Sequence, residues 1–485
     1  MDYILKNIEP KKVFYYFEEI TRIPRESGNE QQISDYIVSV ARKNNLEVIQ
    51  DQALNVIIKK PGTRGYEKSP TVIIQGHMDM VCEKNKNVIH DFDKDPIPII
   101  VDGDYIRTKG TTLGADNGIA VAYMLALLDE DDIEHPPLEA VFTTDEEMGM
   151  KGVIALDESL LNGRILINID TETEGELLIS CAGGSRSRAE ISLKKQIKKE
   201  ESQVYRLSLQ GLKGGHSGTD ICLGRGNANL LIGRILYHLD KNLEYNLIKI
   251  QGGSKDNAIP READAMLSIL PEDEDKLRFL IDECKCILKK EYASVDPDLK
   301  IQIEKSTEEY KYVLSQETKD KILTVLLTIP NGVQTMSAEM PNLVQSSLNL
   351  GIVRMEEESI IFTSSLRSSI QTLKEHMKNQ LCVLFKQLEG KVSFHSDYPA
   401  WEYQPHSAIR KIFQKVYQDI YGKQAKIQAI HAGLECGIFA EKIKDIDMIS
   451  FGPNMWDVHT PNEHVSISSV ERTWNYLLAI LKEIK

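Results

Sequence analysis

The sequence predicts an α/β fold that is interrupted by a long α+β insertion, and three observations lead to this. Mostly apolar strand-like runs, such as Leu138–Thr143 and Arg164–Ile169, alternate with helical periodicity in the first part of the chain. Near Ser187 this pattern gives way to alternating strands and amphipathic helices. The first pattern then returns near the end. Buried strands alternating with helices are typical of a mixed sheet covered by helices.

Length and composition set the broad class of protein. A chain of 485 residues is expected to form about two to four domains. No apolar run reaches the ~18 residues of a membrane span, and no secretory signal is visible at the start. The net charge of −15 argues against a nucleic-acid partner. Seven cysteines without regular spacing favour reduced thiols, so we expect a cytoplasmic protein without a membrane partner.

The first domain is expected to span residues 1–186. Helical periodicity covers Val13–Thr21 and Gln31–Ala41, with a break at Ile23-Pro24 between them. A short strand follows at Asn55–Lys59. Residues 96–109 alternate as a β-hairpin does, with Asp102-Gly103 as its turn.

The insertion is expected to span residues 187–395. The order strand, helix, two strands, helix, strand occurs twice, over about 187–300 and again over 301–395. We therefore predict a pair of sheet-and-helix units.

Residues 396–485 are expected to complete the first domain. Helices are predicted at Ala408–Tyr421 and from Ser468 onward, and a buried strand at Asp447–Phe451. The catalytic domain would then consist of 1–186 and 396–485, on either side of the insertion.

Histidines and carboxylates follow four separate predicted strands. His77 ends the strand in TVIIQGHMDM, and the other positions are Glu146 with Glu147, Asp170, and His459. Because chemistry in open α/β sheets lies at the carboxyl ends of strands, we expect these side chains to meet at one edge. Asp116, in the glycine-rich stretch TTLGADNG before a buried helix, can join them.

The residue types suit two divalent cations held close together. Two zinc ions carry four positive charges, which Asp116, Glu147, Asp170 and a hydroxide would balance. That balance requires one shared carboxylate, and Asp116 is the candidate because glycines flank it. Two metals so bridged lower the pKa of a shared water and polarise a carbonyl. Of the adjacent Glu146 and Glu147, one can bind metal while the other stays uncoordinated as the general base, and Asp79 can hold the imidazole of His77.

Several motifs carry a resemblance to a known family. GHMDMV, GADNGIAVA, TTDEEMGMKG, NIDTE, GGHSG, DNAIPREA and DVHTPNEHV resemble those of the co-catalytic zinc peptidases related to aminoacylase and carboxypeptidase G. HAGLECG and the long insertion resemble the aminoacyl-histidine dipeptidases, also called Xaa-His or cytosol nonspecific dipeptidases. The resemblance implies a mixed-sheet zinc-peptidase domain with an inserted α+β lid of two units.

The resemblance also implies roles for individual residues. One metal would be bound by His77, Asp116 and Asp170, and the other by Asp116, Glu147 and His459. Glu146 would be the base and Asp79 the partner of His77, and the Asp116–Asn117 peptide bond would be cis. In the lid, His216 of GGHSG would stabilise the oxyanion. The substrate carboxylate would be bound by Asn257, Arg367 and Gly433.

We therefore expect a metal-dependent dipeptidase acting on unblocked dipeptides, including Xaa-His. The alternatives are a carboxypeptidase or N-acyl amino acid deacylase with the same chemistry, and an inactive peptide-binding protein. Zinc is the expected metal, with cobalt and manganese as alternatives. The sequence leaves open a monomer or a homodimer, and the roles of His431, Glu435 and His464.

Overall fold

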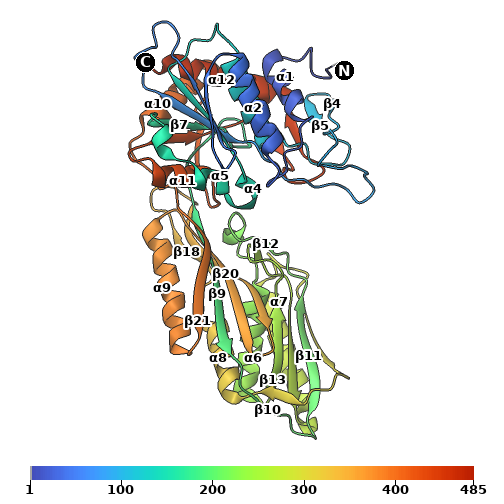
Figure 1. Cartoon of the computed structure of the whole chain (residues 1–485). Helices are drawn as coiled ribbons and strands as arrows, with labels where there is room; N and C mark the ends of the chain where they lie inside the picture. The colour runs from blue at the N-terminus through green and yellow to red at the C-terminus, as the bar shows by residue number, and fades with distance from the viewer. Residues whose placement is uncertain (1–2) are drawn as a thin grey trace. The chain divides into compact units, whose positions relative to one another are not determined.

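The computed structural model describes residues 3–485 and divides them into two compact units (Figure 1). Of the described residues, the first unit contains 3–181, 403–429 and 434–485, and the second contains 182–402 and 430–433. The second unit thus starts five residues before the predicted boundary at 186/187. It also includes a short segment, 430–433, from the middle of the last predicted part.

The first unit is built on an eight-stranded mixed sheet. Its strand order is β1-β2-β6-β3-β7-β23-β8-β22, and β6, β3, β7 and β23 run parallel to one another. Their carboxyl ends therefore lie at one edge of the sheet. The strands are β1 (Glu47–Gln50), β2 (Val56–Lys60), β3 (Val72–His77), β6 (Leu138–Thr143), β7 (Ile165–Asn168), β8 (Glu176–Cys181), β22 (Lys426–Ile430) and β23 (Asp447–Ser450).

The predicted helices of this unit are confirmed. The longer ones are α1 (Lys11–Ile20), α2 (Gln31–Lys43), α3 (Ala115–Leu128), α10 (Ala408–Tyr421) and α12 (Ile467–Glu483). Shorter ones are α4 (Glu146–Gly149), α5 (Lys151–Ala155), the 3-10 helix η1 (Glu158–Leu160) and α11 (Glu435–Lys442). Helix α3 is apolar on all sides, and it packs against both α1 and β3. A helix that is apolar on all sides is buried. The first turn of α3 lies beside the end of β3, where Asp116 meets His77.

The predicted hairpin is confirmed and belongs to a second, four-stranded sheet. The order is β24-β25-β5-β4, with β4 (Ile100–Asp102), β5 (Tyr105–Arg107), β24 (Met455–Trp456) and β25 (His464–Ser466). The loop between β24 and β25 carries His459. Pairing of β25 with β5 therefore anchors this loop to a part of the chain about 360 residues earlier in the sequence.

The second unit is built on a nine-stranded antiparallel sheet. Its order is β16-β11-β15-β13-β19-β20-β9-β21, and β18 also pairs with β19. The strands are β9 (Gly183–Ser192), β11 (Gln203–Gln210), β13 (Asn246–Gly252), β15 (Ala263–Ile269), β16 (Lys300–Lys305), β18 (Gly332–Met336), β19 (Val344–Met355), β20 (Ser359–Ser368) and β21 (Lys391–Tyr398). The two halves of this sheet meet at a single pair of residues, Gly252 of β13 and Val353 of β19.

The two predicted units of the insertion are not contiguous in sequence. Strand β9 precedes every element of the first half, yet it pairs along ten residues with β20 and also with β21 in the second half. The predicted division at residue 300 is therefore wrong in this respect. Local periodicity shows that a segment is a strand, but it carries no information on which distant strand becomes its partner.

The remaining elements of the second unit are four helices, two 3-10 turns and two small sheets. The helices are α6 (Ala228–Asn242), α7 (Glu274–Glu291), α8 (Gln316–Thr328) and α9 (Gln371–Gln387), and the turns are η2 (Ile221–Leu223) and η3 (Pro271–Asp273). The small sheets pair β10 (Lys195–Ile197) with β17 (Tyr312–Leu314) and β12 (Gly215–His216) with β14 (Ala258–Ile259). Among residues 3–485, no helix has the length and apolar composition that crossing a membrane requires.

Candidate metal centre and substrate-binding residues

The six predicted metal-site residues of the first unit come together at the carboxyl edge of its sheet. His77 is the last residue of β3, and Glu146 and Glu147 open α4 directly after β6. Asp170 follows β7 by two residues, and Asp116 lies in the first turn of α3. His459 comes from the loop after β24. Parallel pairing of the strands is thus the reason that residues far apart in sequence meet here.

Asp116 lies between two histidines. Its Oδ1 is 3.2 Å from Nε2 of His77, and its Oδ2 is 3.1 Å from Nε2 of His459. Asp170 Oδ1 is 3.6 Å from Nε2 of His77, while Glu147 Oε1 is 2.8 Å from Nε2 of His459. Two groups of three residues result, and in each the ligand atoms lie within 4.8 Å of one another. The two groups share Asp116.

The electrostatics of this cluster suit cations. Hydrogen bonds with Asp116 and Glu147 raise the pKa of His459 to about 11. Burial, together with the charges of the neighbouring carboxylates Asp116 and Glu147, raises the pKa of Asp170 to about 6. The cluster thus contains carboxylates whose negative charges repel one another and favour the protonated form of His459. Imidazole nitrogens and carboxylate oxygens are a donor set for divalent metal ions, which would relieve this repulsion. The residues present therefore fit such ions.

Asp79 contacts three members of the cluster. Its Oδ1 is 3.4 Å from Nδ1 of His77. The same carboxylate accepts backbone hydrogen bonds from Glu146 at 3.1 Å and from Glu147 at 3.3 Å, and one from the hydroxyl of Ser27 at 2.7 Å. Asp79 therefore orients the imidazole and also holds the start of α4, an N-terminus where a negative charge is favoured.

Glu146 has no fixed partner for its side chain. Within residues 3–485, its carboxylate takes part in no hydrogen bond or ion pair. One of its oxygens nevertheless lies within 4.8 Å of a possible ligand atom of His77 and of one of Glu147. Burial raises its pKa well above the usual value. The neighbouring Glu147, in contrast, points at His459. The two adjacent carboxylates thus occupy different positions, as the sequence predicted for a ligand beside a base.

The loop that carries Asp116 departs from helical geometry. Gly114 is left-handed with φ of 68°, Asp116 has ψ of 110°, and the Asp116–Asn117 peptide bond is cis, as the resemblance implied. The Asn117 side chain donates to the backbone oxygen of Ile169 at 2.6 Å and to Oδ1 of Asp170 at 2.9 Å. Sequence analysis missed Asn117, whose amide orients a predicted ligand.

The other predicted residues lie in the second unit. Nη2 of Arg367, on β20, is 3.3 Å from Nε2 of His216, on β12, and Nη1 of Arg367 donates to the hydroxyl of Tyr398 at 3.2 Å. A Cβ atom at Gly433 would lie 2.7 Å from the ring of Tyr398, so this position has no room for a side chain. Asn257 immediately precedes β14, whose Ala258 pairs with His216.

His431, left open by the sequence, belongs to the same group of residues. It is buried, and its Nε2 lies 2.7 Å from the hydroxyl of Ser347. Burial lowers its pKa to about 3, and the positive charge of Arg367 acts in the same direction. The side chain is therefore a neutral imidazole near a guanidinium, and one that sequence analysis did not assign.

Glu435 and His464 have local partners. Glu435 is fully buried and accepts hydrogen bonds from the side chains of Gln75 at 2.5 Å and Thr143 at 2.7 Å. The ring of His464 stacks on Trp456, with 5.2 Å between their centroids. These contacts of both residues lie within the first unit.

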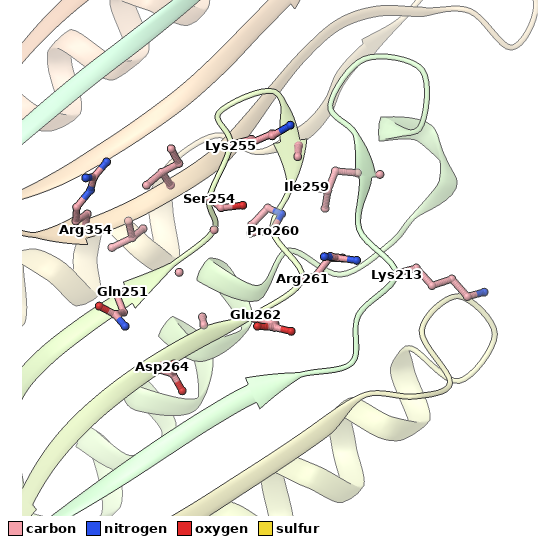
Figure 2. A pocket seen from close by; sticks show the side chains of 17 residues that line it. Lys213, Gln251, Ser254, Lys255, Ile259, Pro260, Arg261, Glu262, Asp264 and Arg354 are labelled. Carbon is pink, nitrogen blue, oxygen red and sulfur yellow. The ribbon is translucent and has the colours of Figure 1, made fainter. Parts of the chain in front are cut away.

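A hollow of about 810 Å³ lies in the second unit (Figure 2). Gly215, Ala258 and Ile259 line it, so it borders the small β12–β14 sheet that carries His216. Figure 2 shows Lys213, Lys255, Arg261 and Arg354 around it, all exposed. The predicted substrate-binding residues are not among those that line the hollow. It is therefore distinct from the His216–Arg367 group.

Comparison with known proteins identifies the class. The sequence model of peptidase family M20/M25/M40 matches residues 73–483, a range that includes all six residues of the candidate metal centre. The chain belongs to this peptidase family.

Two relatives match nearly the whole chain. The cytosol non-specific dipeptidase of Escherichia coli K12 is 38% identical over 480 residues, which is 99% of each chain. The structure of aminoacylhistidine dipeptidase from Vibrio alginolyticus has a TM-score of 0.92 and 38% identity, and covers 99% of this chain and 98% of that one. Aminopeptidase PepT from Bacillus cereus shares the fold, with a TM-score of 0.57, 15% identity and coverage of 98% and 99%.

Proposed function

We propose that this chain is a metal-dependent dipeptidase that hydrolyses the peptide bond of unblocked dipeptides, including those with a C-terminal histidine. The observation that carries the proposal is the position of Asp116, with one carboxylate oxygen toward His77 and the other toward His459. Both full-length relatives at 38% identity are named as dipeptidases, which supports this substrate class.

The proposed metal ligands form two sets. His77, Asp116 and Asp170 would hold one divalent ion, and Asp116, Glu147 and His459 would hold the second. Zinc is the proposed metal because imidazole and carboxylate ligands suit it, although cobalt and manganese bind similar sets. When bound, two such ions polarise the carbonyl of the scissile bond and acidify a water molecule.

The chain's own residues would then manage the proton. Glu146 accepts the proton of the attacking water at its free carboxylate and passes it to the nitrogen of the leaving amino acid. Asp79 keeps the imidazole of His77 in one orientation and holds the backbone of Glu146 in place. Glu146 and Asp79 thus have separate tasks, proton transfer and positioning.

Four residues of the second unit are proposed to bind the substrate. Arg367 suits the terminal carboxylate of a dipeptide because its planar fork can donate two parallel hydrogen bonds. Asn257 and the backbone of Gly433 would add further donors. His216 would donate to the carbonyl oxygen as negative charge develops on it. The protein is proposed to act in the cytoplasm, as a monomer or a homodimer.

The proposal is tested by removing and restoring metals while substrates are compared. The purified chain is stripped with a chelator and then reloaded with Zn²⁺, Co²⁺ or Mn²⁺ separately. The rates of hydrolysis of free dipeptides, tripeptides and N-acyl amino acids are measured, together with the number of metal ions bound per chain. We expect activity to vanish and return with two bound ions, and dipeptides to be cleaved fastest. Full activity without metal, or a preference for N-acyl amino acids, would refute the proposal.

A further inference from the structure

The carboxylate of Glu463 holds the loop that carries Asp116. Its Oε2 accepts hydrogen bonds from the backbone nitrogens of Leu113 at 2.7 Å and Gly114 at 2.9 Å. Its Oε1 accepts from those of Ala115 at 2.8 Å and Asp116 at 3.4 Å. Glu463 is 2% exposed. An ionised carboxylate only accepts hydrogen bonds, so it matches four consecutive N–H groups that have no helical partner at the start of α3.

Arg25 holds the same loop through its carbonyl groups. Its Nη2 donates to the backbone oxygen of Gly114, and its Nη1 donates to those of Met78 at 3.1 Å and Asp79 at 3.2 Å. Arg25 is 2% exposed. A guanidinium only donates hydrogen bonds, and its two Nη atoms can reach carbonyls on two different segments. Arg25 therefore connects the Asp116 loop to the residues that directly follow His77.

The two side chains together connect three segments that carry proposed ligands. Glu463 follows His459 by four residues, so it connects the His459 loop to the Asp116 loop. Gly114 lies between the two side chains, since Glu463 accepts from its nitrogen and Arg25 donates to its oxygen. A Cβ atom at Gly114 would lie only 2.4 Å from Nη2 of Arg25. The glycine is therefore required both by its left-handed φ and by the approach of Arg25.

Burying two charged groups is costly unless each is satisfied by hydrogen bonds. Neither Glu463 nor Arg25 belongs to the groups of possible ligands among the described residues. We propose that Glu463 and Arg25 are positioning residues that fix the backbone of Asp116, so that its two oxygens point at the two metal sites. This inference rests on the proposed function, because it assumes that Asp116 bridges two ions.

Substitution of Glu463 by glutamine separates shape from hydrogen bonding. Glutamine has the same shape, but one of its two terminal atoms is an NH₂ group. In either orientation of the amide, that NH₂ group would face two backbone N–H groups. The loop must then move to relieve the conflict, and Asp116 moves with it.

The experiment measures metal affinity directly. Metal-free parent and Glu463→Gln proteins are titrated with Zn²⁺ in competition with a chromophoric chelator, and the visible spectrum of the Co²⁺ forms is recorded. We expect the variant to bind at least one ion about 10- to 100-fold more weakly, the usual effect of removing a partner that orients ligands. We also expect a changed Co²⁺ spectrum, because the ligand geometry is altered.

Glu139 provides a matched control in the same unit. It is also buried, and it also accepts backbone hydrogen bonds, from Asn162 and Gly163 at 3.0 Å. It lies near the start of β6, at the opposite end of the strand from Glu146. Glu139→Gln should therefore lower the unfolding temperature as Glu463→Gln does, while metal affinities and the Co²⁺ spectrum remain those of the parent.

Arg25→Lys tests the positioning role proposed for Arg25. It also replaces Glu463→Gln as the test if that variant does not fold. A single ammonium nitrogen cannot reach both segments as two Nη atoms do, so we again expect weaker metal binding. Parental affinity and spectrum in either folded variant would overturn the inference, as would failure of both to fold while Glu139→Gln folds. If the parent itself binds fewer than two ions, the proposed function fails instead.

Discussion

Nε2 of His77 and Nε2 of His459 approach the two different oxygens of one carboxylate, that of Asp116, at 3.2 and 3.1 Å. The two histidines come from segments that are 382 residues apart in the sequence. Asp116 is thus the point at which the two proposed ligand sets join, and its removal should affect both.

Asp116→Ala should release both metal ions, because each ion loses a ligand and the two lose their bridge. Asp170→Ala is the matched comparison, since Asp170 pairs with His77, whereas the carboxylates that pair with His459 are Asp116 and Glu147. That variant should lose mainly the ion bound at His77. Metal content measured after dialysis distinguishes the two cases, and two ions at full occupancy in Asp116→Ala would contradict the bridging role.

Glu146→Gln should retain two metal ions and the fold, yet lower turnover by about 10²- to 10⁴-fold, the usual contribution of a general base. The amide keeps the shape of the side chain but cannot accept a proton. Glu147→Gln is the neighbouring control and should lose an ion, because Glu147 contacts His459. Loss of an ion from Glu146→Gln would instead make Glu146 a ligand.

The local sequence pattern was sufficient to predict the strands and helices that position the candidate metal centre. The run before His77 and the runs before Glu146 and Asp170 are apolar because parallel strands are buried on both faces. Their carboxyl ends meet at one edge for topological reasons, so the cluster could be predicted without coordinates. The predicted strand Leu138–Thr143 and helix Ala408–Tyr421 match the observed bounds of β6 and α10.

The supporting residues could not be found in this way. Glu463 and Arg25 act on backbone groups of distant segments, and a backbone partner leaves no trace in the residue types of those segments. Asn117 is similar, since it binds a carbonyl next to Asp170. The pairing of β9 with β20 was missed because the partner of a strand is set by tertiary structure.

His431 should make the stability of the second unit depend on pH. Its folded pKa of about 3 is below the usual value, so the unfolded state binds more protons between about pH 3 and 6.5. The folded state is therefore stabilised fully above that range of pH, and this contribution to the free energy of unfolding is lost as the pH falls through it. In His431→Gln, the slope of unfolding free energy against pH should decrease by up to about 1.4 kcal/mol per pH unit.

Chemical denaturation of metal-free protein at several pH values between 4.5 and 7 checks this slope. His395→Gln, at an exposed histidine of the same unit, is the control and should leave the slope unchanged. An unchanged slope in His431→Gln would show that His431 gains its proton as easily in the folded protein as in the unfolded chain.

Arg367 should explain a preference for dipeptides over longer peptides. If its guanidinium binds the free carboxylate one residue beyond the scissile bond, a longer peptide places a neutral amide there. The partly buried guanidinium would then lack its charged partner, at a cost of about 1–3 kcal/mol, or roughly ten- to a hundred-fold in kcat/KM. Arg367→Ala should therefore raise KM for free dipeptides and leave metal content unchanged. It should also reduce their advantage over C-terminally amidated dipeptides.

His216→Ala gives the contrast to Arg367→Ala, although the two side chains lie 3.3 Å apart. A hydrogen bond to the developing oxyanion strengthens only as the reaction proceeds, so its loss should lower kcat more than it raises KM. Steady-state kinetics on paired free and amidated dipeptides separates the two effects, because only Arg367→Ala should change the ratio between them. If both variants show the parental kcat, KM and ratio, neither residue binds substrate, and the proposed role of the second unit is wrong.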